Sequence, residues 1–277
     1  MSLREVPRKT PRKLNILLAE DNPVNRVLAQ KLLQKQGHTV TSVNNGIEAL
    51  RLWEQNQSRQ FEIILMDVQM PEMDGLQAAT RIRERELGTG AHIPIIAVTA
   101  HAMKGDREKC IAAGMDDYIT KPLRFADLAE LLERYSVGER IERPLESPRA
   151  SSPAAVFDSQ GVLERVLGDR PLLAELLNIF CGEYGQRQAE LREALAARDT
   201  ALLERAAHSL RGSAGNLGAA ATALAAAALE QFARDGDLIG AGESIAAIEA
   251  EMARLLPEIE PFRLPAQQIE PVQGAKV

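Results

Sequence analysis

Acidic, hydroxyl and amine side chains follow short apolar stretches in the first half of this 277-residue chain. Glu20 and Asp21 follow the first stretch, Asp67 follows the third, Thr99 ends the fourth, and Lys121 follows the fifth. In an open α/β sheet, functional groups collect at the carboxyl ends of the strands, so these side chains should share one edge. Three carboxylates at close quarters repel one another and offer the oxygen ligands that a hard cation such as Mg²⁺ requires. With the cation bound, Asp67 could attack phosphorus and form an aspartyl phosphate.

Each of these acids has a simpler interpretation when it is considered alone, because an acid at the end of a strand often caps the helix that follows. For Asp21, and for Asp74 further along the chain, a helix cap is the more frequent role. The whole set is less easily explained in this way, since acids, a hydroxyl and an amine suited to phosphate chemistry follow four of the five expected strands. We therefore predict phosphate chemistry at this edge of the sheet.

A second candidate nucleophile, His208, lies in the helix expected from Thr200 onward. At about 100° per residue, the apolar residues of this helix form one stripe that faces the core of the second domain. His208 falls about 140° from the first residue of the stripe, with Gly212 near 180° and Gly215 near 120°, so we expect an exposed imidazole beside two residues without side chains. Neutral imidazole could attack an acyl phosphate, and Arg211 could neutralise phosphate charge. The simplest alternative is a solvated surface histidine.

Five short apolar or β-branched stretches alternate with helical patterns between residues 14 and 135, which is typical of βα units around a parallel sheet. The expected strands are residues 15–19, 39–43, 63–66, 95–99 and 115–119. Asn22 and Pro23 suit a helix start, Gly37 suits a helix end, and Pro122 closes the last strand before a helix over residues 124–135. We predict a doubly wound, five-stranded α/β domain over residues 14–135.

The composition changes abruptly after residue 135. Residues 136–156 contain several prolines and serines without a sustained period, and we predict a flexible linker there. Strand signals are absent from residue 157 onward, and candidate helix starts lie at Asp158, Asp169, Thr200 and Asp237. These features predict an all-α four-helix bundle over residues 157–257. Residues 258–277 contain further prolines and are expected to be disordered.

The overall composition excludes several classes of protein. Lys and Arg number 33 against 39 for Asp and Glu, so the formal charge is −6, which argues against a nucleic-acid partner. No stretch of about 20 strongly apolar residues is present, so we expect no membrane insertion. The only cysteines, Cys110 and Cys181, fall in different domains, which excludes a disulfide framework and favours a cytoplasmic location.

Four motifs of the first domain resemble those of two-component response-regulator receiver domains, which have a flavodoxin-like fold. The motifs are Leu17-Leu18-Ala19-Glu20-Asp21-Asn22, the ten residues from Met66 to Gly75, Thr99-Ala100, and Tyr118-Ile119-Thr120-Lys121-Pro122. The resemblance spans residues 14–135 and implies that Asp67 is the phosphoacceptor. It also implies that Lys121 binds the acyl phosphate, that Thr99 hydrogen-bonds the phosphoryl group, and that Tyr118 changes rotamer when Thr99 moves.

The same resemblance implies a Mg²⁺ site and a docking face. Asp21, Asp67 and the backbone carbonyl of Gln69 would hold the ion, and Glu20 would help through a water molecule. Receivers use the face around the fourth and fifth strands and helices for partners. We expect the helical domain of this chain to occupy that face while Asp67 is unmodified.

The twelve residues from Ala207 to Gly218 resemble the central motif of histidine-phosphotransfer (Hpt) domains, whose fold is a four-helix bundle. The resemblance implies that His208 is phosphorylated and that Arg211 replaces a basic residue that is lysine in many members. It also implies that Gly212 and Gly215 clear the docking face. An aspartate acceptor and a histidine acceptor in one chain predict a phosphorelay intermediate, with an upstream sensor histidine kinase and a downstream response-regulator receiver as partners.

Three alternatives remain open. The chain could be the C-terminal receiver–Hpt part of a hybrid sensor histidine kinase whose catalytic half is absent. It could also be a Mg²⁺-dependent phosphohydrolase that uses Asp67, or an adaptor whose helical domain docks partners without carrying phosphate. The few residues before residue 14 leave no room for an ATP-binding domain, so we do not expect this chain to phosphorylate itself from ATP. Whether it counts as an enzyme is left open.

Overall fold

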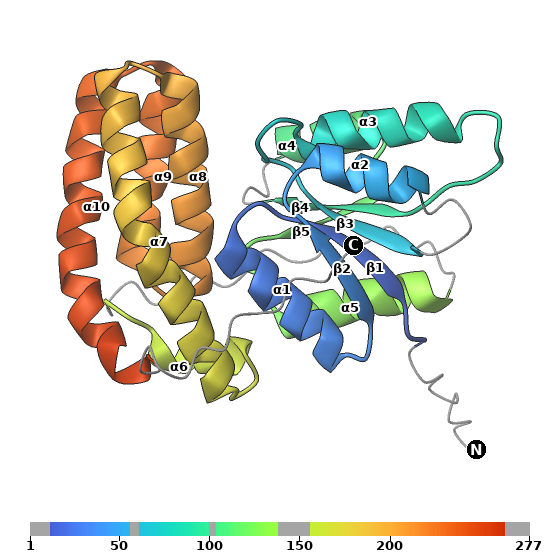
Figure 1. Ribbon diagram of the computed structural model, residues 1–277, viewed down its shortest axis with the longest axis horizontal. Helices are drawn as coiled ribbons and strands as arrows, with labels where there is room; N and C mark the ends of the chain where they lie inside the picture. The colour runs from blue at the N-terminus through green and yellow to red at the C-terminus, as the bar shows by residue number, and fades with distance from the viewer. Residues whose placement is uncertain (1–11, 56–60, 100–103, 138–155, 264–277) are drawn as a thin grey trace, which may run out of the picture.

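The computed structural model describes residues 12–55, 61–99, 104–137 and 156–263, and it consists of a sheet domain beside a helical domain (Figure 1). The sheet domain has five parallel strands in the order β2-β1-β3-β4-β5. The strands are β1 (Asn15–Ala19), β2 (Thr39–Val43), β3 (Ile63–Asp67), β4 (Ile95–Thr99) and β5 (Asp117–Thr120). This architecture confirms the predicted doubly wound sheet, in which β1 and β3 are neighbours at the point where the strand order reverses.

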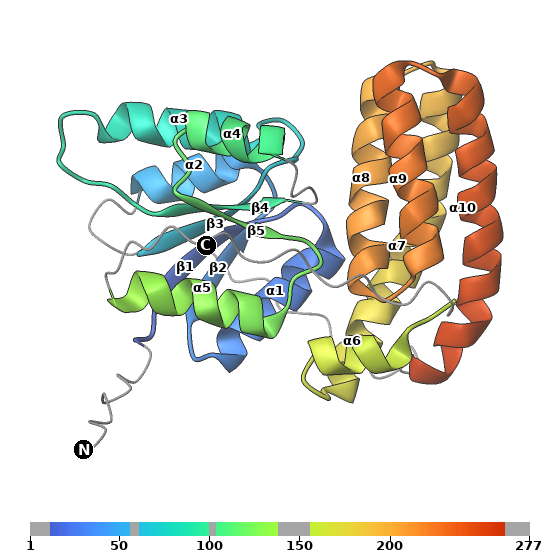
Figure 2. The same ribbon diagram turned by 180° about the vertical axis from the view of Figure 1, so that it is seen from behind.

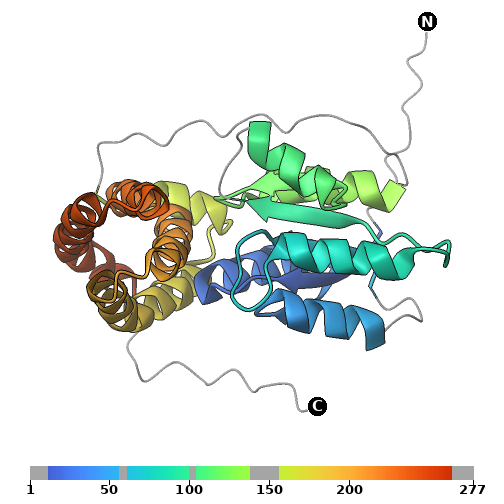
Figure 3. The same cartoon turned by 90° about the horizontal axis from the view of Figure 1, so that it is seen from above.

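Two layers of helices cover the sheet (Figures 1 and 3). Helices α1 (Pro23–Lys35) and α5 (Phe125–Val137) lie on one face, and α2 (Gly46–Gln55), α3 (Gly75–Glu86) and α4 (Lys104–Ala112) lie on the other. Every residue of β3 and β4 is buried, because side chains on both faces of these central strands pack beneath helices. The sheet is therefore a rigid base for groups at its edge.

Local sequence explains where the elements at this edge begin. The Asn22 side chain accepts a hydrogen bond from the backbone N–H of Asn25 and caps α1, as predicted, and Pro23 follows at the first helical position. Asp74 caps α3 in the same way, which confirms its simpler interpretation. Gly75 is required there, because a Cβ atom at this position would lie 2.1 Å from the carbonyl oxygen of Asp67. The turn after β3 therefore folds tightly against Asp67.

The predicted last strand was misplaced by two residues at its start. It was expected over residues 115–119 and is observed over Asp117–Thr120. The carboxylate of Asp116 accepts hydrogen bonds from Arg83 and from the backbone N–H of Ile95, and Met115 is buried in the core. These contacts hold both residues in a loop that leads into the strand.

The helical domain is an antiparallel bundle preceded by a short helix. It contains α6 (Ser159–Arg165), α7 (Arg170–Ala196), α8 (Thr200–Asn216), α9 (Ala220–Asp235) and α10 (Leu238–Ile259), followed by a 3-10 turn, η1 (Glu260–Phe262). Figure 3 looks along the bundle and shows α7 to α10 arranged around a common core. Aspartates cap α6, α7, α8 and α10. The predicted four-helix bundle is confirmed.

The prediction of disorder after residue 257 was wrong for residues 258–263. Helix α10 continues through Pro257 to Ile259, whose side chain is buried, and η1 follows it. The Phe262 ring packs edge-on against Phe157 with centroids 5.3 Å apart, and Arg263 Nε donates to Asn178 Oδ1 at 2.9 Å. These packing contacts outweigh the backbone hydrogen bond that proline removes. Residues 264–277 lie outside the described residues.

The predicted linker over residues 136–156 falls largely on residues 138–155, which also lie outside the described residues. Its first two residues are helical, because α5 extends to Val137. Among the described residues, no helix combines the length and the apolar composition needed to cross a bilayer.

The two domains meet through helix α1, which packs against α7 and α8 (Figures 1 and 2). The helical domain was predicted to cover the face around the fourth and fifth strands and helices, but it docks mainly on α1. That face contributes only a smaller part of the contact, such as the hydrogen bond from the backbone N–H of Leu123 to Asn216 Oδ1. Amide side chains of α1 meet small and polar residues of α8 in this contact. The carboxyl edge of the sheet consequently faces the bundle.

Candidate functional site

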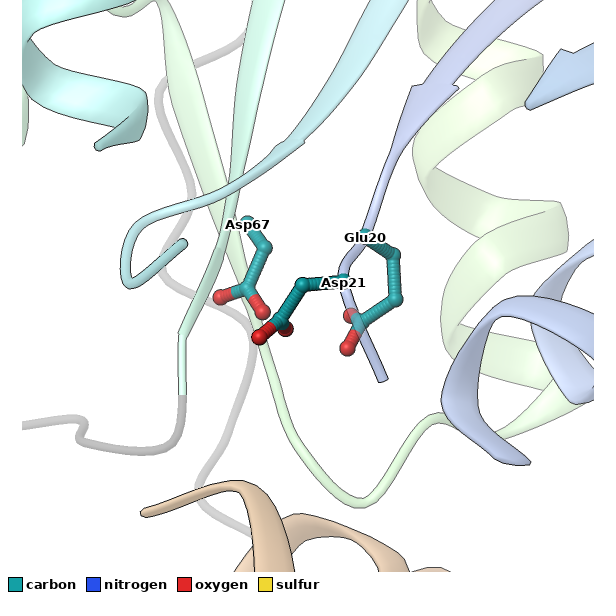
Figure 4. Close-up of side chains that lie close together, drawn as sticks. All are labelled: Glu20, Asp21 and Asp67. Carbon is teal, nitrogen blue, oxygen red and sulfur yellow. The ribbon is translucent and has the colours of Figure 1, made fainter. Parts of the chain in front are cut away.

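Three carboxylates meet at the carboxyl edge of the sheet (Figure 4). Glu20 and Asp21 directly follow β1, and Asp67 is the last residue of β3. One carboxylate oxygen from each residue lies within 4.8 Å of the others. Glu20 and Asp67 are buried, at 1% exposed each, whereas Asp21 is partly exposed at the mouth of the cluster.

Lys121 lies between two of these acids. Its ammonium group is 2.7 Å from Asp67 Oδ2 and 2.8 Å from Glu20 Oε2. Burial alone would lower the pKa of Lys121, but the carboxylates of Asp67 and Glu20 outweigh burial and raise it above its usual value. The ammonium group is therefore permanently charged and neutralises one of the three acids.

The remaining negative charge makes the acids costly to ionise. Burial, followed by the repulsion of Glu20, raises the pKa of Asp21 to about 6. Burial and the Glu20 charge also raise the pKa of Asp67 above its usual range, although Lys121 opposes them. A divalent cation would neutralise the excess negative charge of the three carboxylates, and carboxylate oxygens at these separations are the ligands that Mg²⁺ prefers. The donor set thus fits a Mg²⁺ ion.

Two of the other predicted residues of the sheet domain lie beside Asp67, and the third packs in the core. Thr99 is buried at the end of β4, and Gln69 donates its backbone N–H to Asp67 Oδ1 at 3.3 Å. Tyr118 is half-buried on β5 and packs against the core between the sheet and helices α2, α3 and α4. Thr99 and Gln69 line a common cleft with Asp67, whereas Tyr118 does not belong to the lining of this cleft.

The prediction that His208 is exposed was wrong, because only 6% of its surface is accessible. The helical wheel placed it outside the core stripe of the bundle, but it could not foresee that the sheet domain would cover this face of α8. Its Nδ1 atom lies 3.2 Å from Glu230 Oε1 on the neighbouring helix α9. Its Nε2 atom is buried and has no hydrogen-bond partner among the described residues.

Glu230 is the centre of an ion-pair network that the sequence did not reveal. Arg211 Nη1 lies 3.0 Å from Glu230 Oε2, and Arg234, one turn further along α9, also pairs with Glu230. Arg234 Nε in addition lies 2.7 Å from Glu204 on α8. Glu230 and Arg234 lie in α9, whose alanine-rich start suggested packing alone. Only their spacing of four residues indicated a possible ion pair.

Burial lowers the pKa of His208, although the hydrogen bond to Glu230 opposes this shift. Burial would raise the pKa of Glu230, but the hydrogen bond to His208 and the charges of Arg211 and Arg234 lower it. At neutral pH the imidazole is consequently neutral and the carboxylate is charged. A neutral ring whose Nδ1 proton is donated to Glu230 leaves the lone pair on Nε2.

The two predicted nucleophiles border one cleft of about 370 Å³ between the domains. The sheet domain contributes Asp67, Gln69 and Thr99, and the helical domain contributes His208, Glu204 and Arg234. Of the two predicted docking glycines, Gly212 faces the sheet domain, since a Cβ atom there would lie 3.0 Å from Asn25 Nδ2. A Cβ atom on Gly215 would have no neighbour within 4 Å, so the structure does not bring Gly215 to the contact.

Comparison with known protein families gives two matches. The family model for the response regulator receiver domain matches residues 16–133, and the model for the Hpt domain matches residues 175–257. The matches lie in the sheet domain and in the helical domain, respectively.

Two curated relatives match across both domains. The chain is 35% identical over 217 residues to the sensor histidine kinase GacS of Pseudomonas protegens. This alignment covers 76% of this chain and 23% of that protein. It is 31% identical over 260 residues to the histidine-protein kinase BarA of Escherichia coli, in an alignment that covers 92% of this chain and 27% of that protein. The chain therefore spans about a quarter of the length of these relatives.

Among solved structures, the receiver domain of the sensor histidine kinase PA1611 from Pseudomonas aeruginosa is 43% identical to the matched part of this chain. The match covers 46% of this chain and 99% of that receiver, with a TM-score of 0.41. That crystal structure has a magnesium ion coordinated in its active-site cleft.

Proposed function

Because the chain belongs to the two-component phosphorelay proteins, with a response regulator receiver domain followed by an Hpt domain, we propose that Asp67 accepts a phosphoryl group and that His208 receives it next. The sheet domain is the receiver, assigned to residues 14–135, and the helical domain is the Hpt domain, assigned to residues 157–257. The observation that carries the proposal is the cleft that Asp67 and His208 share. Two nucleophiles on one cleft can exchange a phosphoryl group directly.

In the first transfer, a carboxylate oxygen of Asp67 attacks the phosphorus of the donor, and the donor's leaving group departs with the electrons of the broken bond. Lys121, 2.7 Å from Asp67, binds an oxygen of the incoming group, and Thr99 hydrogen-bonds another. Tyr118 changes rotamer as Thr99 moves. Glu20, Asp21, Asp67 and the backbone carbonyl of Gln69 would hold Mg²⁺, which when bound would neutralise charge on the phosphoryl oxygens.

In the second transfer, Nε2 of His208 attacks the phosphorus, and the bond to Asp67 breaks with its electrons remaining on the carboxylate. The Nδ1 proton stays on the ring and is donated to Glu230, whose charge stabilises the positive charge that the ring acquires. Arg234, which lines the cleft and pairs with Glu230, would bind phosphoryl oxygens, and Arg211, which also pairs with Glu230, would help to neutralise their charge. The second transfer thus uses groups of the Hpt domain.

The upstream donor is assigned as a sensor histidine kinase, and the downstream acceptor as the aspartate of another receiver. The similarity to GacS and BarA supports a second assignment, in which the same two transfers occur within a hybrid sensor histidine kinase. The residues that carry phosphate are the same in both assignments. Only the source of the phosphoryl group differs.

Phosphate transfer from a radiolabelled promiscuous histidine kinase tests the proposed function. Wild type, Asp67→Asn and His208→Gln are incubated with Mg²⁺, and acid-labile, base-stable phosphohistidine is separated from base-labile acyl phosphate. We expect phosphohistidine in wild type only, and acyl phosphate in His208→Gln. Unchanged phosphohistidine in either variant would refute the route, and multiple turnover on a phosphate ester would favour the phosphohydrolase alternative.

A further inference from the structure

The contact between the domains is a set of buried polar residues, which we name the α1–α8 seam. It consists of Asn22 and Asn25 at the start of α1, and of Ser209, Gly212, Ser213 and Asn216 on α8. Asn22 Nδ2 donates to Ser213 Oγ at 2.7 Å and lies 2.8 Å from Ser209 Oγ. The seam therefore starts one residue from Asp21 and one residue from His208.

Asn216 fixes the register at the far end of the seam. Its Nδ2 atom donates to Asn25 Oδ1 at 2.7 Å, and its Oδ1 atom accepts from the backbone N–H of Leu123 at 3.2 Å. Asn216 is 1% exposed, so a partner displaced along α8 would leave its amide buried without these hydrogen bonds. Each amide thus finds its partners in one docking position.

Two further contacts set the distance and the orientation of the domains. Gly212 allows Asn25 to approach α8 closely, because a Cβ atom would lie 3.0 Å from Asn25 Nδ2. Beyond the seam, Lys35 Nζ at the end of α1 lies 2.7 Å from Asp169 Oδ2 at the start of α7. The receiver is therefore held at both ends of helix α1.

This closed arrangement hides both nucleophiles. Gly212 and Asn216 lie four and eight positions after His208 and therefore share its face of α8, and Ser209 and Ser213 flank that face. A second receiver that presents its aspartate to Nε2 of His208 has to occupy the face that α1 now covers. Its access and the closed arrangement are therefore mutually exclusive.

We propose that the α1–α8 seam makes the chain's own receiver the preferred occupant of the His208 face, so that phosphate passes from Asp67 to His208 within one molecule. A second receiver reaches His208 only after the seam opens. This inference rests on the proposed function and adds the choice of partner to it. The receiver of the same chain is the donor, and it competes with the receiver that accepts the phosphate next.

A complementation experiment tests whether transfer is intramolecular. Full-length chains at about 10 μM are phosphorylated with acetyl phosphate and Mg²⁺, and phosphohistidine is measured in wild type and in an equimolar mixture of Asp67→Asn and His208→Gln. A tethered partner has an effective concentration of about 1 mM, so wild type should form phosphohistidine about 100-fold faster than the mixture. Its rate constant should not depend on protein concentration.

The outcomes separate this inference from the proposed function. If the mixture forms phosphohistidine as fast as wild type, or if the wild-type rate constant rises in proportion to concentration, intramolecular transfer is refuted while the relay stands. If wild type forms no phosphohistidine, or if Asp67→Asn alone forms it, the proposed function fails and the inference fails with it.

A pair of glycine variants tests the role of the seam. Gly212→Ala adds a methyl group against Asn25, whereas Gly182→Ala on α7 adds one where nothing lies within 4 Å. Introduced into wild type, Gly212→Ala should slow intramolecular transfer several-fold, and small-angle X-ray scattering should show a larger radius of gyration. Gly182→Ala should change neither quantity. Equal behaviour of the two variants would refute the seam as the contact that selects the donor.

Discussion

The pocket around Asp67 and the pocket around His208 both bury a nucleophile among charged side chains, but their charge balances differ. In the first pocket the carboxylates of Glu20, Asp21 and Asp67 face the ammonium group of Lys121. This pocket therefore has an excess of negative charge, which appears in the raised pKa values of Asp21 and Asp67.

In the second pocket the charges are balanced. Glu230 pairs with Arg211 and Arg234, and Arg234 also pairs with Glu204. The first pocket thus needs a cation from solution before it can receive an anion, whereas the second supplies its own cations. Entry of phosphate at Asp67 should depend on Mg²⁺ far more strongly than events confined to His208.

The strongest test of this difference compares an acid from each pocket. Asp21→Asn should weaken Mg²⁺ binding by about 10-fold to 100-fold, because it removes one carboxylate from the cluster. Glu230→Gln should leave Mg²⁺ binding unchanged, because Glu230 belongs to the other pocket. Titration calorimetry with Mg²⁺ measures both affinities, and an equal loss in the two variants would erase the distinction between the pockets.

Within the second pocket, the Glu230 charge should matter for rate. Glu230→Gln should slow formation of phosphohistidine about tenfold, less than the roughly 100-fold loss typical of a removed oxyanion donor, because the amide oxygen still accepts the Nδ1 proton. Single-turnover transfer from phosphorylated Asp67 in quenched samples gives the rate constant. A variant as fast as wild type would show that Glu230 contributes only to packing.

The pH dependence of Mg²⁺ stabilisation should separate the pockets further. The ion binds the ionised acids, and the pKa of Asp21 is about 6, so the Mg²⁺-induced rise in Tm should shrink as the pH falls from about 7 to about 5. Without Mg²⁺ the contribution of Asp21 to stability has the opposite pH dependence. Its pKa is higher in the folded protein than in the unfolded chain, so ionisation of Asp21 lowers the free energy of unfolding as the pH rises through about 6. In Asp21→Asn the Mg²⁺-induced rise in Tm should depend less on pH, whereas in His208→Gln its pH dependence should match that of wild type.

The smallest expected effect concerns the stability of the bundle that carries His208. Gly182→Ala should stabilise the protein by about 0.5–1 kcal/mol, because glycine is unfavourable inside a helix. Gly212→Ala should stabilise the protein by less than Gly182→Ala, since its new methyl group lies against Asn25. Urea unfolding of both variants provides the comparison, and an equal gain would mean that the seam does not crowd Gly212.

The sequence predicts the sheet and its acid cluster well, because parallel strands bring their carboxyl ends to one edge whatever the helices do. Glu20, Asp21, Asp67, Thr99 and Lys121 could therefore be grouped from strand order alone. Their predicted roles in phosphate transfer stay predictions.

Features that depend on contacts between distant helices escaped prediction. The burial of His208 results from a docked domain, and its Glu230 partner comes from a neighbouring helix 22 residues away. The continuation of α10 past Pro257 depends on packing against Phe157 and Asn178, which precede it by many residues. A periodic pattern within one segment carries no information about such partners.

Hydrogen bonds join the docking contact to the acid cluster. Asn216 donates to Asn25, Asn25 donates to Glu20 at 2.9 Å, and Glu20 is paired with Lys121. A ligand that draws Glu20 away from Asn25 changes the free energy of docking, and docking changes the affinity for that ligand by the same factor. Docking of the two domains and ligand binding at Glu20 are thus linked equilibria, so a change in one should be measurable in the other.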